Sequence, residues 1–228
     1  MLRFIACLLL SFSVGISAEP TLRQYAAEYT VHLSGVKVGE LSRSLQHLGD
    51  GEYLLETRAY TTGFASWFKP DEAVSKTRWS FIGGQPVPHR FDYHYSGRRS
   101  ERVEWSVFDW ERGVVKSKRR GRTTELELEE GVLDTQVFEV VMQQGLAKGL
   151  QRASHQVVSR GRIADYEYEV LGHEIVVTRP FGEVDTVKVQ RGDTTMWLAP
   201  AHDYIVVRIR QRDGGNTANS YITQVSYH

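Results

Sequence analysis

Almost the whole chain beyond its first twenty residues alternates apolar and polar side chains with a period of two. This alternation is typical of β-strands that bury one face, and turn signals such as Ser34-Gly35 separate the runs. The runs predicted to be strands are 25–33, 36–48, 52–62, 73–82, 89–95, 102–108, 114–120, 122–129, 155–160, 166–171, 174–179, 184–190, 194–198, 204–212 and 217–227. So many strands joined by short turns must curl, close or stack, because exposed sheet edges invite aggregation.

One segment, about residues 134–149, has a helical period instead. Asp134 can cap a helix, and Gly145 and Gly149 would fray its end. Its apolar positions recur at spacings of one, three and four: Val137, Phe138, Val141, Met142 and Leu146. We therefore predict a mainly β protein, a curled antiparallel sheet or open β-barrel-like single domain with this one α-helix laid into or across it. A flat two-sheet sandwich is the alternative.

The N-terminus has the pattern of a cleavable signal peptide. Arg3 precedes an apolar run from Phe4 to Ile16, and Ala18 offers a small residue for cleavage. We expect residues 1–18 to be removed and residues 19–228 to form the domain. The apolar run is shorter than the ~20 residues that span a bilayer, and we expect no transmembrane segment in the mature chain. The single cysteine, Cys7, lies inside this run, so the mature chain needs no disulfide.

Charge and composition exclude several classes of protein. The chain has 28 basic and 28 acidic residues, and 41% of its residues are hydrophobic. Neutrality argues against nucleic acid as a partner, and the apolar fraction is too high for disorder. The basic run that begins at Lys116 would pair with an acidic run across a turn at Arg120-Gly121, with Lys116 opposite Glu125. We interpret that run as a solvated hairpin face.

Motifs for catalysis or metal binding are weak. His89 and His94 are five residues apart on a predicted strand and would point to opposite faces, and neither HxH nor HExxH occurs. We expect no metal site and no cofactor. No serine lies in a GxSxG elbow, although a triad drawn from Asp92, His94 and Ser96 or Ser100 is left open. We assign no catalytic residue.

Two features point to ligand binding. The segment 63–70 breaks the strand pattern and places Phe64, Trp67 and Phe68 before a proline. It is either a plug at one end of the sheet or a lid over an apolar cavity, since loops on a rigid sheet often carry binding residues.

The second feature combines tyrosines and arginines on strands. Tyr93 and Tyr95 alternate on one predicted strand, and Arg208 and Arg210 alternate on another. Arginine binds carboxylate or phosphate groups, and tyrosine lines apolar walls or stacks on sugar rings. Solvated sheet faces are the alternative, because charged side chains also protect edge strands.

The order of several short motifs resembles a known family. These motifs are Tyr29-Thr30-Val31, 34–40, 53–63, 88–95, 107–109, the helix start at Asp134, and 196–200 before 204–208. Together they resemble the bacterial exported family of unknown function DUF3108, over nearly the whole mature chain. The resemblance implies an exported, single-domain, mostly β protein in the periplasm of a Gram-negative bacterium. More loosely, it implies similarity to the half-open barrels of lipoprotein carriers, which wrap apolar ligands.

We therefore expect a non-enzymatic periplasmic protein that binds a lipid-like or acyl-bearing envelope component in a groove of its curled sheet. The alternative is a docking module without an internal cavity, which would bind an envelope protein or a cell-wall glycan. An envelope hydrolase is the third hypothesis.

Overall fold

The structure is a computed structural model that describes residues 22–62, 71–97 and 100–228. Within these residues fifteen strands form one sheet, in the order β8-β7-β6-β5-β4-β3-β2-β1-β15-β14-β13-β12-β11-β10-β9. The strands are β1 (Tyr25–Leu33), β2 (Val36–Gly49), β3 (Glu52–Thr61), β4 (Glu72–Ile82), β5 (Gln85–Ser96), β6 (Glu101–Asp109), β7 (Val114–Arg119), β8 (Arg122–Glu127), β9 (Leu133–Asp134), β10 (Arg152–Ser159), β11 (Arg162–Thr178), β12 (Gly182–Arg191), β13 (Thr194–Ala199), β14 (Ile205–Asp213) and β15 (Asn216–Tyr227).

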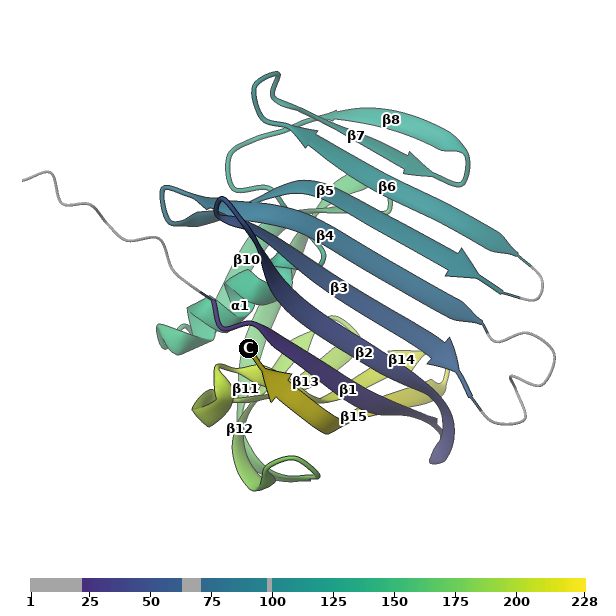
Figure 1. Cartoon of the computed structure of the whole chain (residues 1–228), viewed down its shortest axis with the longest axis vertical. Helices are drawn as coiled ribbons and strands as arrows, with labels where there is room; N and C mark the ends of the chain where they lie inside the picture. The colour runs from purple at the N-terminus through teal and green to yellow at the C-terminus, as the bar shows by residue number, and fades with distance from the viewer. Residues whose placement is uncertain (1–21, 63–70, 98–99) are drawn as a thin grey trace, which may run out of the picture.

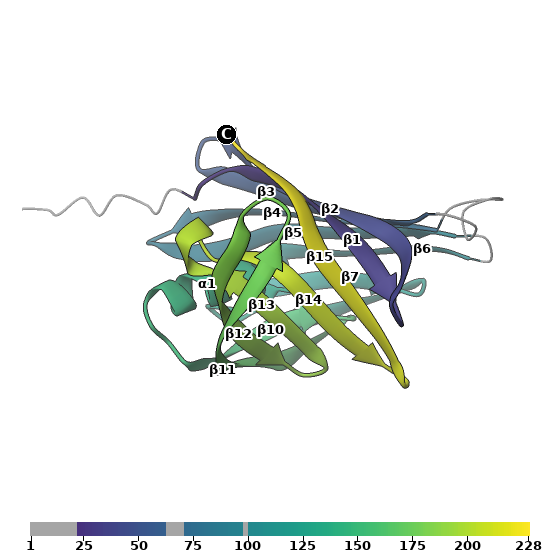
Figure 2. The same cartoon turned by 90° about the horizontal axis from the view of Figure 1, so that it is seen from below.

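The sheet consists of two meanders joined by the pairing of β1 with β15. In this pairing Tyr25 lies opposite Tyr227 and Leu33 lies opposite Ala218. All the pairs are antiparallel except β9 with β10, and the two end strands, β8 and β9, are not paired with each other. Strands β1 to β8 form one wall, and the C-terminal strands curve round beneath it (Figures 1 and 2). The predicted mainly β, curled, open sheet with one helix is therefore confirmed.

The α-helix, α1 (Val137–Ala147), lies against the concave side of this sheet, at the left in Figure 1 beside β2. Just before it, Asp134 Oδ1 accepts hydrogen bonds from the backbone N–H groups of Gln136 and Val137, at 2.7 and 2.9 Å. Beyond its end, Gly149 has φ +81°, a left-handed conformation that commonly terminates helices. No helix in the described part of the chain is long and apolar enough to cross a bilayer.

The main core lies between α1 and the concave face of the sheet. Phe138 and Met142 of α1 are fully buried, as is Trp79 of β4, which stacks on Tyr53 at 4.8 Å between ring centroids. The helix therefore fills one end of the curled sheet. A second cluster covers the other face of β13, because Met196 and Leu198 belong to the main core while Trp197 lies in the second cluster.

The predicted register of one hairpin agrees with the structure, and the residues of its turn explain why. The β7–β8 hairpin has the predicted register, with Lys116 opposite Glu125 and Val115 opposite Leu126. A two-residue turn at Arg120-Gly121, both with positive φ, leaves this register little freedom.

Several elements differ from the sequence prediction. Helix α1 begins at Val137 rather than near Asp134, and Asp134 lies in the short strand β9, which the sequence does not predict. The predicted strands 166–171 and 174–179 form one long strand, β11. Gly172, with φ +133°, lies at a β-bulge in this strand, where the sequence predicts a break. Strand β5 begins at Gln85, inside the predicted break at 83–88. Gly145 does not fray α1 but is buried within it, where the hydroxyl of Tyr168 occupies the space of a side chain.

The carboxyl group of Asp134 makes folding stability depend on pH. Burial raises its pKa to about 6, although the two backbone N–H groups oppose this rise. Because the unfolded value is about 3.9, the folded chain binds this proton more tightly, and its contribution to stability is lost as pH rises through 6.

We expect Asp134→Asn to keep the two backbone hydrogen bonds while removing this titration. Between pH 4 and pH 7 the free energy of unfolding of wild type should fall by up to about 3 kcal/mol more than that of the variant, since one pKa unit is worth about 1.4 kcal/mol. Urea unfolding of both proteins from pH 4 to 7 measures this. Parallel pH profiles would contradict the assignment.

Candidate functional site

The concave face changes character along the strands, away from α1. The register of β3 with β4 places Tyr53 beside Trp79 near the helix, then Thr57 beside Ser75, then Ala59 beside Ala73. Apolar side chains packed against the helix thus give way to polar ones and then to small apolar ones. Of the hollows on this face, we name three the central, basic and apolar hollows.

The central hollow, of about 260 Å³, contains a largely buried ion pair between the sheet and the helix. Arg43 of β2 donates to the carboxylate of Glu139 of α1, and their side chains are 11% and 22% exposed. Burial is the largest single effect on the pKa of Arg43 and works to lower it, but Glu139 together with Tyr25 and Tyr29 outweighs burial, so the net direction is upward. Burial also raises the pKa of Tyr29, whose hydroxyl donates to the carbonyl of Val206 at 2.8 Å.

The basic hollow, of about 500 Å³, adjoins the central one through Ser75 and Thr135. Its charged lining residues are Arg102, Glu104, Lys118, Arg119, Arg120 and Arg160. They come from β6, from the β7–β8 hairpin and from the turn between β10 and β11. The sequence predicts that the cations of the β7–β8 hairpin face solvent. Lys116 does pair with Glu125 across this hairpin, at 3.6 Å. Arg119, in contrast, lines the basic hollow and lies 3.3 Å from Glu104.

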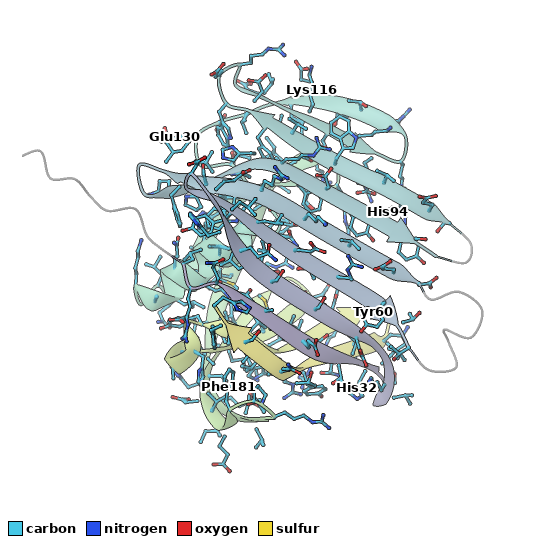
Figure 3. The ribbon with its side chains drawn as sticks, in the orientation of Figure 1. His32, Tyr60, His94, Lys116, Glu130 and Phe181 are labelled. Atoms are coloured by element: carbon cyan, nitrogen blue, oxygen red, sulfur yellow. The ribbon has the colours of Figure 1, made fainter. Side chains whose placement is uncertain are left out.

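The apolar hollow, of about 300 Å³, lies at the far ends of the strands, beyond the central hollow. Its lining includes Val31, Gly39, Ala59, Ala73 and Tyr95. A Cβ at Gly39 would lie 2.6 Å from the carbonyl oxygen of Tyr60, so the backbones approach too closely here for a larger residue. Figure 3 labels Tyr60 at this end of the wall.

The two predicted tyrosines lie on the concave face. Tyr93 lines the basic hollow and Tyr95 lines the apolar hollow. The guanidinium of Arg102 lies 4.5 Å from the ring centroid of Tyr95, so a residue that lines the basic hollow contacts one that lines the apolar hollow. Burial raises the pKa of Tyr93, which keeps its phenol protonated as a possible hydrogen-bond donor.

The predicted arginines lie on another face. Arg208 and Arg210 have their guanidinium carbons 4.4 and 5.3 Å from the ring centroid of Trp197, on the side of the sheet opposite Met196. The structure therefore does not bring them together with the tyrosines. Phe64, Trp67 and Phe68 lie outside the described residues.

Two of the catalytic groups that the sequence leaves open, Asp92 and His94, have partners outside that triad. Asp92 pairs with Arg90 at 2.6 Å, and His94 bonds to Glu101 at 2.9 Å. The structure instead places Ser80 Oγ 2.8 Å from Nε2 of His89, a contact that the sequence analysis missed. Neither residue lines the three hollows named here. Among residues 22–62, 71–97 and 100–228, no group of three His, Cys, Asp or Glu side chains is placed to hold a metal.

The functional residues that sequence reasoning missed are of two kinds. Ala59 and Ala73 matter because they are small, and a single alanine in a strand carries no signal. Arg102 and Arg160 are brought to one hollow only by the curl of the sheet. The amino-acid sequence offers no local pattern that joins them.

The sequence profile of a protein family of unknown function, DUF3108, matches residues 28–223. The chain belongs to DUF3108. This DUF3108 protein is similar in fold to a β-barrel-like protein of another domain of unknown function, DUF1849, from Brucella abortus, whose crystal structure is known. The TM-score is 0.63, the identity is 11%, and the match covers 91% of this chain and 98% of the other. No match is found among curated proteins.

Proposed function

We propose that this DUF3108 protein is an exported, non-enzymatic binding protein of the Gram-negative periplasm. Its ligand is an acyl-bearing envelope molecule held on the concave face of the open sheet. The signal-peptide pattern of residues 1–18 supports export. The position of the hollows, on a curled sheet that α1 fills at only one end, supports binding on this face.

The observation that carries the proposal is the apolar hollow. Interior positions near α1 hold large side chains such as Trp79, whereas the same face ends in Gly39, Ala59 and Ala73. These small residues leave about 300 Å³ open, near the lower limit of small-molecule sites. Transfer of an acyl chain from water to such a surface is favourable by roughly 0.8 kcal/mol for each buried CH₂ group.

A single substitution tests the proposal. We expect Ala73→Phe to fill the apolar hollow and to weaken binding of a fluorescent fatty-acid probe at least tenfold. Val74→Phe is the matched control, because Val74 is the next residue of β4 and points to the opposite face. It should bind the probe within about twofold of wild type.

Two results would count against the proposal. Wild-type protein that fails to bind the probe would remove its basis. Equal binding by the Ala73→Phe and Val74→Phe variants would place the acyl chain elsewhere. Circular dichroism of both variants verifies that a loss of binding is not a loss of folding.

A further inference from the structure

The basic hollow concentrates positive charge on a chain that is neutral overall. Five basic residues line it, and Glu104 is the only acidic residue among its lining residues. Arg119 engages that carboxylate at 3.3 Å. The neighbouring hollow of about 660 Å³, which also includes Arg160, is balanced by Asp165, Glu167 and Asp193. The excess of cations is therefore specific to the basic hollow, where it creates a positive potential.

Hydroxyl groups surround the same space. Tyr93, Ser75, Ser106 and Ser117 line the hollow, and Ser106 donates to Ser117 at 3.0 Å. Arginine forks together with hydroxyl donors are the groups that bind phosphate oxygens in proteins. The lining thus has both the charge and the donors for a phosphate.

Arg102 connects this hollow to the apolar one. The guanidinium of Arg102 stacks on the ring of Tyr95. Tyr95 lines the apolar hollow, and Arg102 lines the basic hollow. A cation held over an aromatic ring keeps donors free for an anion. One molecule could therefore place an acyl chain against Ala73 and an anionic group beside Arg102.

We propose that the basic hollow binds the phosphate headgroup of the acyl-bearing ligand; this inference rests on the proposed function. The ligand class is then a phosphorylated amphiphile, with its tail in the apolar hollow and its phosphate among Arg102, Arg119 and Arg160. Both Arg102 and Arg160 are exposed residues, so either can be changed without opening the core.

Three ligands separate the contributions of tail and headgroup. Dodecyl phosphate and dodecyl maltoside share one tail, and inorganic phosphate has none. Calorimetric titration below the micelle-forming concentrations measures each affinity. We expect wild type to bind dodecyl phosphate at least tenfold more tightly than dodecyl maltoside, with an advantage that shrinks as salt rises.

The double variant Arg102→Gln with Arg160→Gln should lose this headgroup preference while still binding dodecyl maltoside. The matched control is Arg112→Gln, which removes an arginine that is 60% exposed and lies outside the hollow; its preference should be unchanged.

Each remaining outcome decides a different point. Equal wild-type affinity for both dodecyl compounds, or a preference that survives the double substitution, would overturn the phosphate assignment and leave the acyl site standing. Failure to bind either dodecyl compound would overturn the proposed function itself. If inorganic phosphate displaces dodecyl phosphate at similar concentrations, the basic hollow binds anions. Its ligand is then the free phosphate ion and not a lipid headgroup.

Discussion

Replacing Glu139 with glutamine should destabilise the protein by about 3 kcal/mol or more, because removal of one partner leaves the other charge buried and uncompensated. Arg43 is 11% exposed, and Glu139 of α1 is its ion-pair partner. The Nε atom of the same guanidinium is buried without a hydrogen-bond partner among the described residues. Urea unfolding followed by circular dichroism measures the loss.

The same chemical change at an exposed pair provides the control. Arg152 and Glu169 are 2.6 Å apart with side chains 68% and 53% exposed. Exposed ion pairs contribute roughly 0–1 kcal/mol, so Glu169→Gln should change stability little. The double variant Arg43→Met with Glu139→Leu should recover most of the loss, since buried pairs can often be replaced by apolar side chains. Equal effects of the two glutamine substitutions would show that the central pair is solvated.

Truncation of Phe138 should cost about 3–5 kcal/mol, the range for a large buried aromatic residue changed to alanine. Phe138 is fully buried, and its ring lies 5.5 Å from that of Tyr166 and 6.4 Å from that of Tyr168, centroid to centroid. It therefore fixes α1 to β11, while Glu139 fixes the next position of the helix to β2.

Phe138→Leu retains most of the volume and should lose less than half as much stability as Phe138→Ala. Differential scanning calorimetry of the three proteins compares them directly. A loss below about 1 kcal/mol for the alanine variant would contradict the packing described for α1.

Local patterns predicted most of the fold because strand alternation and turn residues act over a few positions. The β7–β8 hairpin register followed from Arg120-Gly121 alone. The pairing of β1 with β15 and the curvature of the sheet depend on contacts between distant segments. No short window of sequence specifies them.

The candidate site was predictable only in part, for the same reason. Tyr93 and Tyr95 stand out in sequence as alternating aromatic residues, and they line two of the hollows. Arg208 alternates in sequence in the same way, yet the sheet places it over Trp197 on the other face. Small residues and distant arginines acquire their meaning only when the curl brings them to one surface.

The most direct test of the central claim is native mass spectrometry. The protein is expressed with its full N-terminus and purified from the envelope without detergent. The account predicts a bound mass that contains an acyl chain and a phosphate, absent from Ala73→Phe and retained by Val74→Phe. A spectrum that shows the bare protein mass for wild type and both variants would contradict it.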